Sequence, residues 1–133
     1  LSRGLGDVYK RQIYVRRSGR HSAGGERMNE TGIPFRQLPW QPGGHPLERK
    51  KSLPGARAAM LAFEPGFADP NWCARGHAGY VLGGALRFEL RNGSLTIEQG
   101  DGFEIDAGTE HRAGNPGSEP VVLFIVSWDE DAG

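Results

Sequence analysis

Apolar and polar residues alternate along two adjacent segments in the second half of the chain. The segments are 86–91 and 94–98, and Asn92-Gly93 lies between them. Alternation with a period of two predicts β-strands with one buried face, and Asn-Gly is a frequent two-residue loop in type I′ hairpins. We therefore expect a hairpin, and the cross-strand pairs that this loop predicts are Leu90–Leu95, Phe88–Ile97 and Arg87–Glu98.

The remaining apolar pattern predicts further short strands and no helix. Strands are expected over 57–64 and 103–106, which end in glycine-containing turns, and over 35–40. Residues 42–56 are interrupted by Pro and Gly and are expected to form a loop. The nearly continuous apolar run 121–128 is typical of a strand covered on both faces or lying at an oligomer interface. Seven or eight strands without an internal repeat predict an all-β closed barrel or two-sheet jelly roll.

Composition agrees with a small β domain. A chain of 133 residues has room for one domain, and its 21 glycines and nine prolines suit many short strands joined by turns. No apolar run approaches the roughly 18 residues of a membrane span, so no membrane association is predicted. The single cysteine, Cys73, excludes an internal disulfide and fits a reducing compartment.

The first residues resemble a translated sequencing adapter. Residues 2–12 read SRGLGDVYKRQ, which resembles the in-frame translation of a transposase adapter used in sequencing libraries. We expect residues 1–27 to be a disordered, non-native leader and residues 28–133 to be the native domain, beginning at Met28. An Arg-rich targeting peptide is the competing interpretation. The residues after Met28 lack a signal-peptide pattern, which predicts a cytoplasmic protein.

The zero net charge conceals an asymmetry along the chain. Residues 1–27 hold seven of the 16 basic residues and two of the 16 acidic residues. Nine basic and fourteen acidic residues remain in 28–133, a balance of −5. A mildly acidic domain without a basic stripe does not suit a phosphate backbone, so nucleic-acid binding is not expected.

Two glycine-bounded segments carry the residues suited to chemistry. The second begins at Gly100 and places His111 and Asn115 at the spacing of a cupin motif, G-x5-P-x-G-x2-H-x3-N. Gly108 also matches, and Asp106 stands in the place of the proline. The segment therefore resembles the second motif of the cupin family, in which this histidine is a consistent metal ligand.

The segment from Gly66 to Gly84 resembles the first cupin motif, G-x5-H-x-H-x3,4-E-x6-G, with altered chemistry and with the opening glycine, Gly66, one residue closer than in the pattern. Asn71 and Cys73 stand at the two histidine places, and His77 stands at the glutamate place. The string WCARGHAGYVL is similar to a bacterial cupin subgroup from which no activity can be carried over. Over about residues 57–127, the resemblance implies a small single-domain bacterial cupin. Its fold would be an all-β jelly roll, also called a double-stranded β-helix barrel.

The three side chains Cys73, His77 and His111 form a candidate metal site. Alternate residues of a barrel strand point inward, so Asn71 and Cys73 share a direction, and His77 follows a turn that Gly76 permits. One thiolate and two imidazoles suit a divalent transition metal such as Zn, Fe, Ni or Cu, and suit Mg²⁺ or Ca²⁺ poorly. Three protein ligands leave a coordination position open, as in catalytic zinc sites.

Each of these residues also has a structural interpretation. A lone cysteine is most often a small buried apolar group. The alternative for His77 is a structural histidine that is hydrogen-bonded in the mouth of the barrel. Asn71 is a candidate for a turn or for a hydrogen bond to a ligand. Glu104 and Asp106 are candidates to orient His111. The sequence identifies no catalytic acid–base pair.

Three hypotheses for function follow. The first is a metal-dependent enzyme of dioxygenase, isomerase or lyase type acting on a small organic molecule. The second is a non-catalytic small-molecule binder or sensor, and the third is a degenerate cupin kept for dimerisation. The fold alone does not decide among them. A homodimer is expected from the resemblance.

Overall fold

The computed structural model describes residues 31–129, which fall into two parts. The first part comprises residues 31–39 and 52–56, and no strand forms within it. The strand predicted over 35–40 is wrong, because the carbonyl of Pro34 accepts the N–H groups of Gln37 and Leu38 (2.8 and 3.1 Å) and closes a turn. The expected leader, 1–27, lies outside the described residues. No helix within 31–129 is long and apolar enough to cross a membrane.

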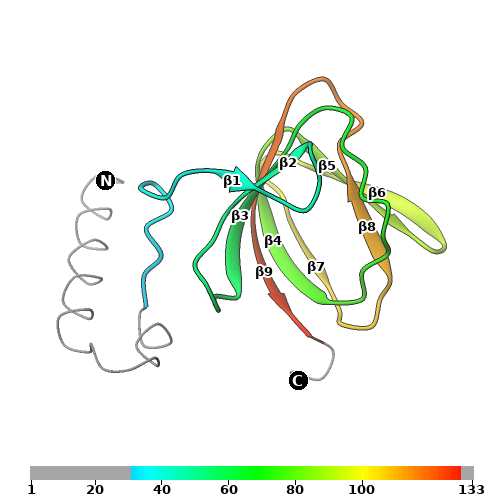
Figure 1. The fold of residues 1–133 in the computed structure, drawn as a ribbon. Helices are drawn as coiled ribbons and strands as arrows, with labels where there is room; N and C mark the ends of the chain where they lie inside the picture. The colour runs from blue at the N-terminus through cyan, green and yellow to red at the C-terminus, as the bar shows by residue number, and fades with distance from the viewer. Residues whose placement is uncertain (1–30, 130–133) are drawn as a thin grey trace. The chain divides into compact units, whose positions relative to one another are not determined.

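The second part, residues 40–51 and 57–129, consists of two antiparallel sheets (Figure 1). One sheet has the order β1-β2-β3-β9-β4-β7, and the other has the order β6-β5-β8. The predicted all-β jelly-roll barrel is confirmed. The strands are β1 (Gln41–Pro42), β2 (Glu48–Lys51), β3 (Ala58–Phe63), β4 (Gly76–Gly83), β5 (Ala85–Leu90), β6 (Gly93–Glu98), β7 (Gly102–Ile105), β8 (His111–Gly114) and β9 (Val121–Trp128).

Strand β2 lies inside the segment that the sequence predicted to be a loop. Its sequence, ERKK, has no apolar residue, so it carries no alternating signal. It is a strand because it pairs with β3, with Glu48 opposite Phe63 and Lys51 opposite Met60. Charged residues are common near the edge of a sheet, where they discourage pairing with other chains. The described residues therefore contain nine strands rather than the seven or eight expected.

Strand β9 lies between β3 and β4 at the centre of the six-stranded sheet and has the predicted bounds. Val121, Leu123 and Ile125 point into the core, and the residues between them are half-buried. Apolar residues from both sheets complete this core: Phe63, Phe67, Val81, Leu86, Phe88, Ile97 and Ile105. The core thus fills the space between the two sheets, and polar residues that enter it must have partners there.

The predicted hairpin forms, but its register differs by two residues. The two-residue loop is Arg91-Asn92, so Leu90 lies opposite Gly93. The observed pairs are Phe88–Leu95, Arg87–Thr96, Leu86–Ile97 and Ala85–Glu98. A shift of two keeps every side chain on its predicted face, and it places Leu86 in the core with no exposed surface. Gly93 has a φ of +151°, which is far from the left-handed value that a type I′ loop position needs.

Candidate metal centre

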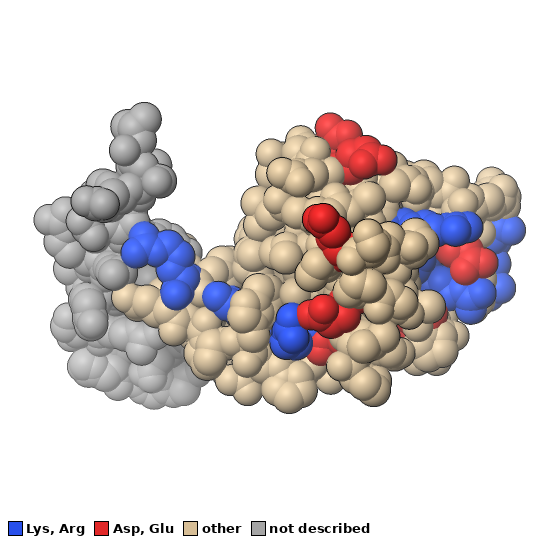
Figure 2. All heavy atoms as spheres, turned by 90° about the horizontal axis from the view of Figure 1, so that it is seen from above, with Lys and Arg blue, Asp and Glu red and all other residues tan. Residues whose placement is uncertain are grey.

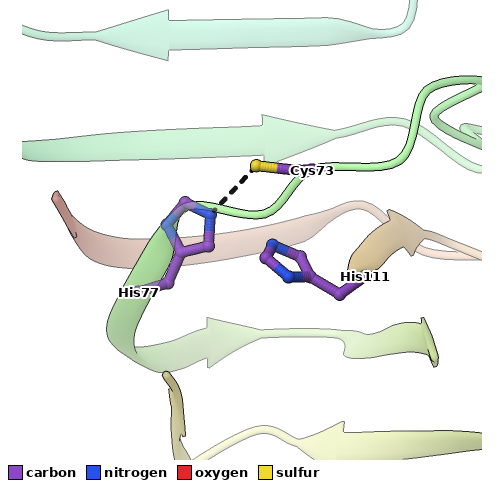
Figure 3. Close-up of side chains that lie close together, drawn as sticks. All are labelled: Cys73, His77 and His111. Atoms are coloured by element: carbon purple, nitrogen blue, oxygen red, sulfur yellow. Dashed lines mark hydrogen bonds between the residues drawn. The ribbon is translucent and has the colours of Figure 1, made fainter. Parts of the chain in front are cut away.

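Cys73 and His111 lie opposite each other at the edge of the three-stranded sheet. The N–H of Cys73 donates to the carbonyl of His111 (2.8 Å), and the N–H of His111 donates to the carbonyl of Cys73 (2.9 Å). Directly opposite residues of an antiparallel pair project their side chains to the same face. The thiol and the imidazole therefore point together toward His77 in the facing sheet (Figure 3).

His77 lies on β4, and its orientation is set by its neighbours on the six-stranded sheet. The expected turn at Gly76 is wrong: Gly76 is the first residue of β4, and a side chain there would overlap the indole of Trp128. Ser127 lies directly opposite His77, with its Oγ 2.8 Å from Nδ1. The other ring nitrogen, Nε2, lies 3.8 Å from Sγ of Cys73.

The ligand-capable atoms of Cys73, His77 and His111 all lie within 4.8 Å of one another. The carbonyl of Thr109, which can only accept, lies 2.8 Å from Nδ1 of His111. Nδ1 therefore carries the proton, and Nε2 of the neutral ring presents a lone pair. This Nε2 is buried without a hydrogen-bond partner among the described residues, an unfavourable state for a polar atom. A divalent transition metal would satisfy it, so the donor set fits such an ion.

The electrostatics of the site favour the neutral, ligating form of His77. Burial lowers the pKa of His77 to about 4, and the charge of His111, when that ring is protonated, and the charge of Arg75 act in the same direction. The imidazole is therefore unprotonated at neutral pH, as a metal ligand must be. The backbone N–H of Arg75 lies 3.5 Å from Sγ of Cys73 and donates to the sulfur.

The three side chains line a cavity of about 170 Å³ between the sheets. Most of its wall is apolar, and two carboxylate-bearing residues, Glu48 and Asp69, also border it. Sequence reasoning missed Glu48 because the residue falls in the predicted loop. Its place at the cavity follows from the pairing of β2 with β3, which no local pattern reveals. The remaining lining residues are Leu61, Phe63, Phe67, Leu86, Phe88, Arg112, Ala113, Leu123 and Ile125.

Three other residues considered from the sequence lie away from the cluster. Asn71 is exposed, and its backbone N–H donates to the carboxylate of Asp69 (3.0 Å). Glu104 and Asp106 are also exposed. The groups that hydrogen-bond to the two histidine rings are instead the hydroxyl of Ser127 and the carbonyl of Thr109. A backbone carbonyl leaves no mark in the sequence, so only the fold identifies the second of these.

Asn115, the last residue of the second motif, belongs to the scaffold. It is 1% exposed, and its Nδ2 donates to the carbonyls of Phe63 (2.9 Å) and Glu119 (2.8 Å). Its Oδ1 accepts the N–H of Gly117 (3.0 Å). The side chain thus ties the loop after β8 to the end of β3 and satisfies all its polar atoms.

The fold and the site together define a class: a small two-sheet jelly-roll barrel with a Cys/His/His cluster in its interior. The cupin domain family (Cupin_2) matches residues 60–127, and the chain belongs to this family. No curated protein matches the chain.

Several solved structures have a similar fold. KdgF from Halomonas sp. is 22% identical, with a TM-score of 0.58 over 72% of this chain and 93% of that chain. A sugar phosphate isomerase of the cupin superfamily from Silicibacter pomeroyi is 15% identical, with a TM-score of 0.59 over 74% and 75% of the two chains. The cupin domain of an XRE-family transcriptional regulator from Enterobacter cloacae is 16% identical, with a TM-score of 0.52 over 62% and 96%. At these identities the likeness shows the fold alone.

Proposed function

We propose that this chain is a metal-dependent enzyme acting on a small organic molecule, with Cys73, His77 and His111 as the metal ligands. The observation that carries the proposal is Nε2 of His111, a buried acceptor without a partner among the described residues that points toward a thiol and a second imidazole. A purely structural histidine would pair both ring nitrogens. Zn, Fe, Ni and Cu all accept this mixture of sulfur and nitrogen donors.

The cavity limits the size and polarity of the substrate. Its volume of about 170 Å³ is close to that of a cavity that holds a benzene-sized molecule, roughly 150 Å³. Aromatic and aliphatic side chains such as Phe88 and Leu123 surround most of it. The substrate is therefore a compact molecule with an apolar body and one polar group directed at the ligand cluster.

The residues around the cavity divide the chemical tasks. Three protein ligands leave an open position, at which a bound metal would polarise a carbonyl or lower the pKa of water. Cys73 binds as the thiolate, which the N–H of Arg75 helps to stabilise. Glu48 borders the same cavity, and we assign it the transfer of a proton to or from the substrate. Its Oε1 accepts the N–H of Gly44 (3.1 Å), an exposed contact that anchors the carboxylate to the turn between β1 and β2.

Elemental analysis of the full chain tests the metal site. Protein purified under reducing, anaerobic conditions is expected to hold close to one equivalent of a transition metal. His111→Ala and Cys73→Ser should lose most of it, and Asn71→Ala, altered at an exposed residue outside the cluster, should keep it. Less than about a tenth of an equivalent in the unaltered protein, after reconstitution with each of the four metals, would overturn the proposal.

Turnover assays separate the reaction classes and test Glu48. A dioxygenase consumes O₂ when given a substrate, whereas an isomerase or a lyase converts carbonyl or enol compounds without O₂. Within the observed class, Glu48→Gln should lower kcat by about 100-fold or more and leave the metal content unchanged. Unchanged kcat in Glu48→Gln would remove this residue from the mechanism.

The second candidate is a non-catalytic small-molecule binder or sensor. It is favoured by the first motif, in which His77 replaces the carboxylate of the usual pattern. A domain of the same fold belongs to an XRE-family transcriptional regulator, so this fold also serves in regulation. Metal-replete protein that binds ligands in the cavity and turns over none of them would support this function over the first.

A further inference from the structure

The segment that carries Cys73 is held to β8 by isolated pairings rather than by a continuous strand. Bridges occur at Ala68–Gly114 and at Cys73–His111, and the N–H of Asp69 donates to the carbonyl of Ala113 (3.0 Å). The residues immediately after Asp69 are exposed. Backbone hydrogen bonds therefore constrain this segment less than the continuous strand pairing of β4 constrains His77.

Trp72 adds a constraint on the outer side of this segment. Successive side chains of an extended segment point to opposite faces, so Trp72 faces outward when Cys73 faces the cavity. The Cζ atom of Arg91 lies 3.9 Å from the centroid of the Trp72 ring, and that of Arg112 lies 4.3 Å from it. Both distances are within the range of cation–π attraction, for which tryptophan is the best partner.

The two guanidinium groups are themselves fixed by carboxylates. Nε of Arg91 lies 2.8 Å from Oε1 of Glu110, and Nε of Arg112 lies 2.8 Å from Oε1 of Glu89, its direct cross-strand partner. Basic and acidic side chains lie intermixed on this end of the molecule (Figure 2). Because Arg91 belongs to the hairpin loop and Arg112 to β8, the indole of Trp72 is tied to two elements of the sheet.

We propose that Trp72 is a positioning residue that holds Cys73 in its ligating position, through contacts with Arg91 and Arg112 on the opposite face of the sheet. This inference rests on the proposed metal site. Without the indole, the backbone bonds of Cys73 to His111, the bond from the N–H of Gly108 to the carbonyl of Ala74 (2.8 Å) and the exposed Arg75–Asp129 ion pair are left to fix the segment next to Cys73. The thiol would then sample positions farther from Nε2 of His77, and the metal would lose its sulfur ligand for part of the time.

The experiment compares three variants of the full chain. Trp72→Leu keeps an apolar side chain and removes the aromatic ring, whereas Trp72→Phe keeps a ring. Arg87→Met is the matched control, because Arg87 is an exposed arginine on the same sheet whose guanidinium lies near Ser94. The first readout is Co²⁺ affinity by competition with a chromophoric chelator, together with the sulfur-to-cobalt charge-transfer band. The second is the rate at which Ellman's reagent labels Cys73 in metal-free protein.

Trp72→Leu should weaken Co²⁺ binding by about tenfold, the lower end of what groups supporting a ligand contribute. It should also reduce the charge-transfer band and accelerate thiol labelling under conditions where melting shows the protein folded. Trp72→Phe should restore most of the Co²⁺ affinity, the charge-transfer band and the slow labelling of the unaltered protein. Arg87→Met should match the unaltered protein in all three measurements. Labelling and affinity that are unchanged in folded Trp72→Leu would overturn the inference.

Two further outcomes keep this test separate from that of the metal site. If the unaltered protein binds no metal, the proposed function fails, but the labelling rates in metal-free protein still decide the role of Trp72. If Trp72→Leu does not fold, Arg91→Gln removes one guanidinium and leaves the segment intact. That variant should label roughly threefold faster, as expected for one exposed cation–π contact, and a rate equal to that of Arg87→Met would overturn the inference.

Discussion

Ser127 and His77 are direct cross-strand neighbours, and Oγ of Ser127 lies 2.8 Å from Nδ1 of His77. When Nδ1–H donates to this oxygen, the imidazole is fixed with Nε2 toward Cys73. A hydrogen bond of this kind selects the tautomer and the direction of a ligating ring. Ser127 therefore controls whether His77 can act as a ligand.

Ser127→Ala should weaken metal binding without unfolding the protein. The loss of one hydrogen bond to a ligand commonly lowers metal affinity by about 10–100-fold, and we expect about tenfold here. Competition with a chelator of known affinity measures the change. Ser94→Ala is the control, because Ser94 is exposed on β6 and lies in the other sheet. Equal affinities in the two variants would contradict this role for Ser127.

The lowered pKa of His77 predicts how the metal-free protein responds to acid. An imidazole with the ordinary pKa of 6.5 takes up its proton in the unfolded chain at a pH where His77, with a pKa of about 4 in the fold, stays neutral. The unfolded state binds more protons between these values, so the free energy of unfolding falls as the pH drops from about 6.5 toward 4.

Urea denaturation of chelator-treated protein at pH 7.5 and pH 5 measures this effect. His77→Gln cannot titrate, so its free energy of unfolding should fall less between the two pH values than that of the unaltered protein. Equal falls would show that His77 is not the titrating group. The comparison is made without metal, because a bound ion would itself compete with the proton.

Substitution by alanine at two glycines of β4 should have very different effects on the free energy of unfolding. A Cβ at Gly79 would overlap the ring of Phe103 and lie 2.5 Å from the carbonyl oxygen of Phe124, whereas a Cβ at Gly83 meets no atom within 4 Å. Gly79→Ala should therefore lower the free energy of unfolding by roughly 1–3 kcal/mol. Gly83→Ala should change it by less than about 0.5 kcal/mol. Similar values for the two variants, measured by urea denaturation, would argue against this packing.

Asn115→Ala should be among the more damaging polar substitutions. The change removes three hydrogen bonds and leaves the buried carbonyl of Phe63 without its donor, at a cost of about 3 kcal/mol in the free energy of unfolding. Thermal and urea melts measure it. Asn71→Ala serves as control, because this asparagine is exposed and its side chain makes no bond in the network. A loss below about 1 kcal/mol in Asn115→Ala would contradict the structural role.

The sequence predicted those parts of the fold whose cause is local. The apolar alternation around Leu86 and Phe88 and the continuous run at β9 are consequences of burial, and both are strands in the structure. The register of the hairpin was wrong, because the loop type depends on the φ of Gly93. Gly93 has a φ of +151°, and it lies opposite Leu90 as the first residue of β6 rather than in the loop.

The spacing of the two motifs predicted the three candidate ligands of the site but not the groups around them. Spacing brought Cys73, His77 and His111 into consideration, and the structure places them together. The groups that orient the two rings were not predictable, because Ser127 contributes through strand pairing and Thr109 through its backbone. Glu48 was missed for a related reason: its strand has no apolar residue and exists because β3 pairs with it.

Cys73 and His111 are held opposite each other by two backbone hydrogen bonds, which do not depend on the side chain at position 73. The main chain sets where position 73 projects, so a different side chain there would enter the same interior without a new fold. Cys73→His would convert the cluster to three imidazole nitrogen donors. Such a set is less soft than one that contains a thiolate, so its preference among transition metals would differ. A single substitution at position 73 would therefore change the donor atoms offered to a bound metal, while the main chain around the cluster stays the same.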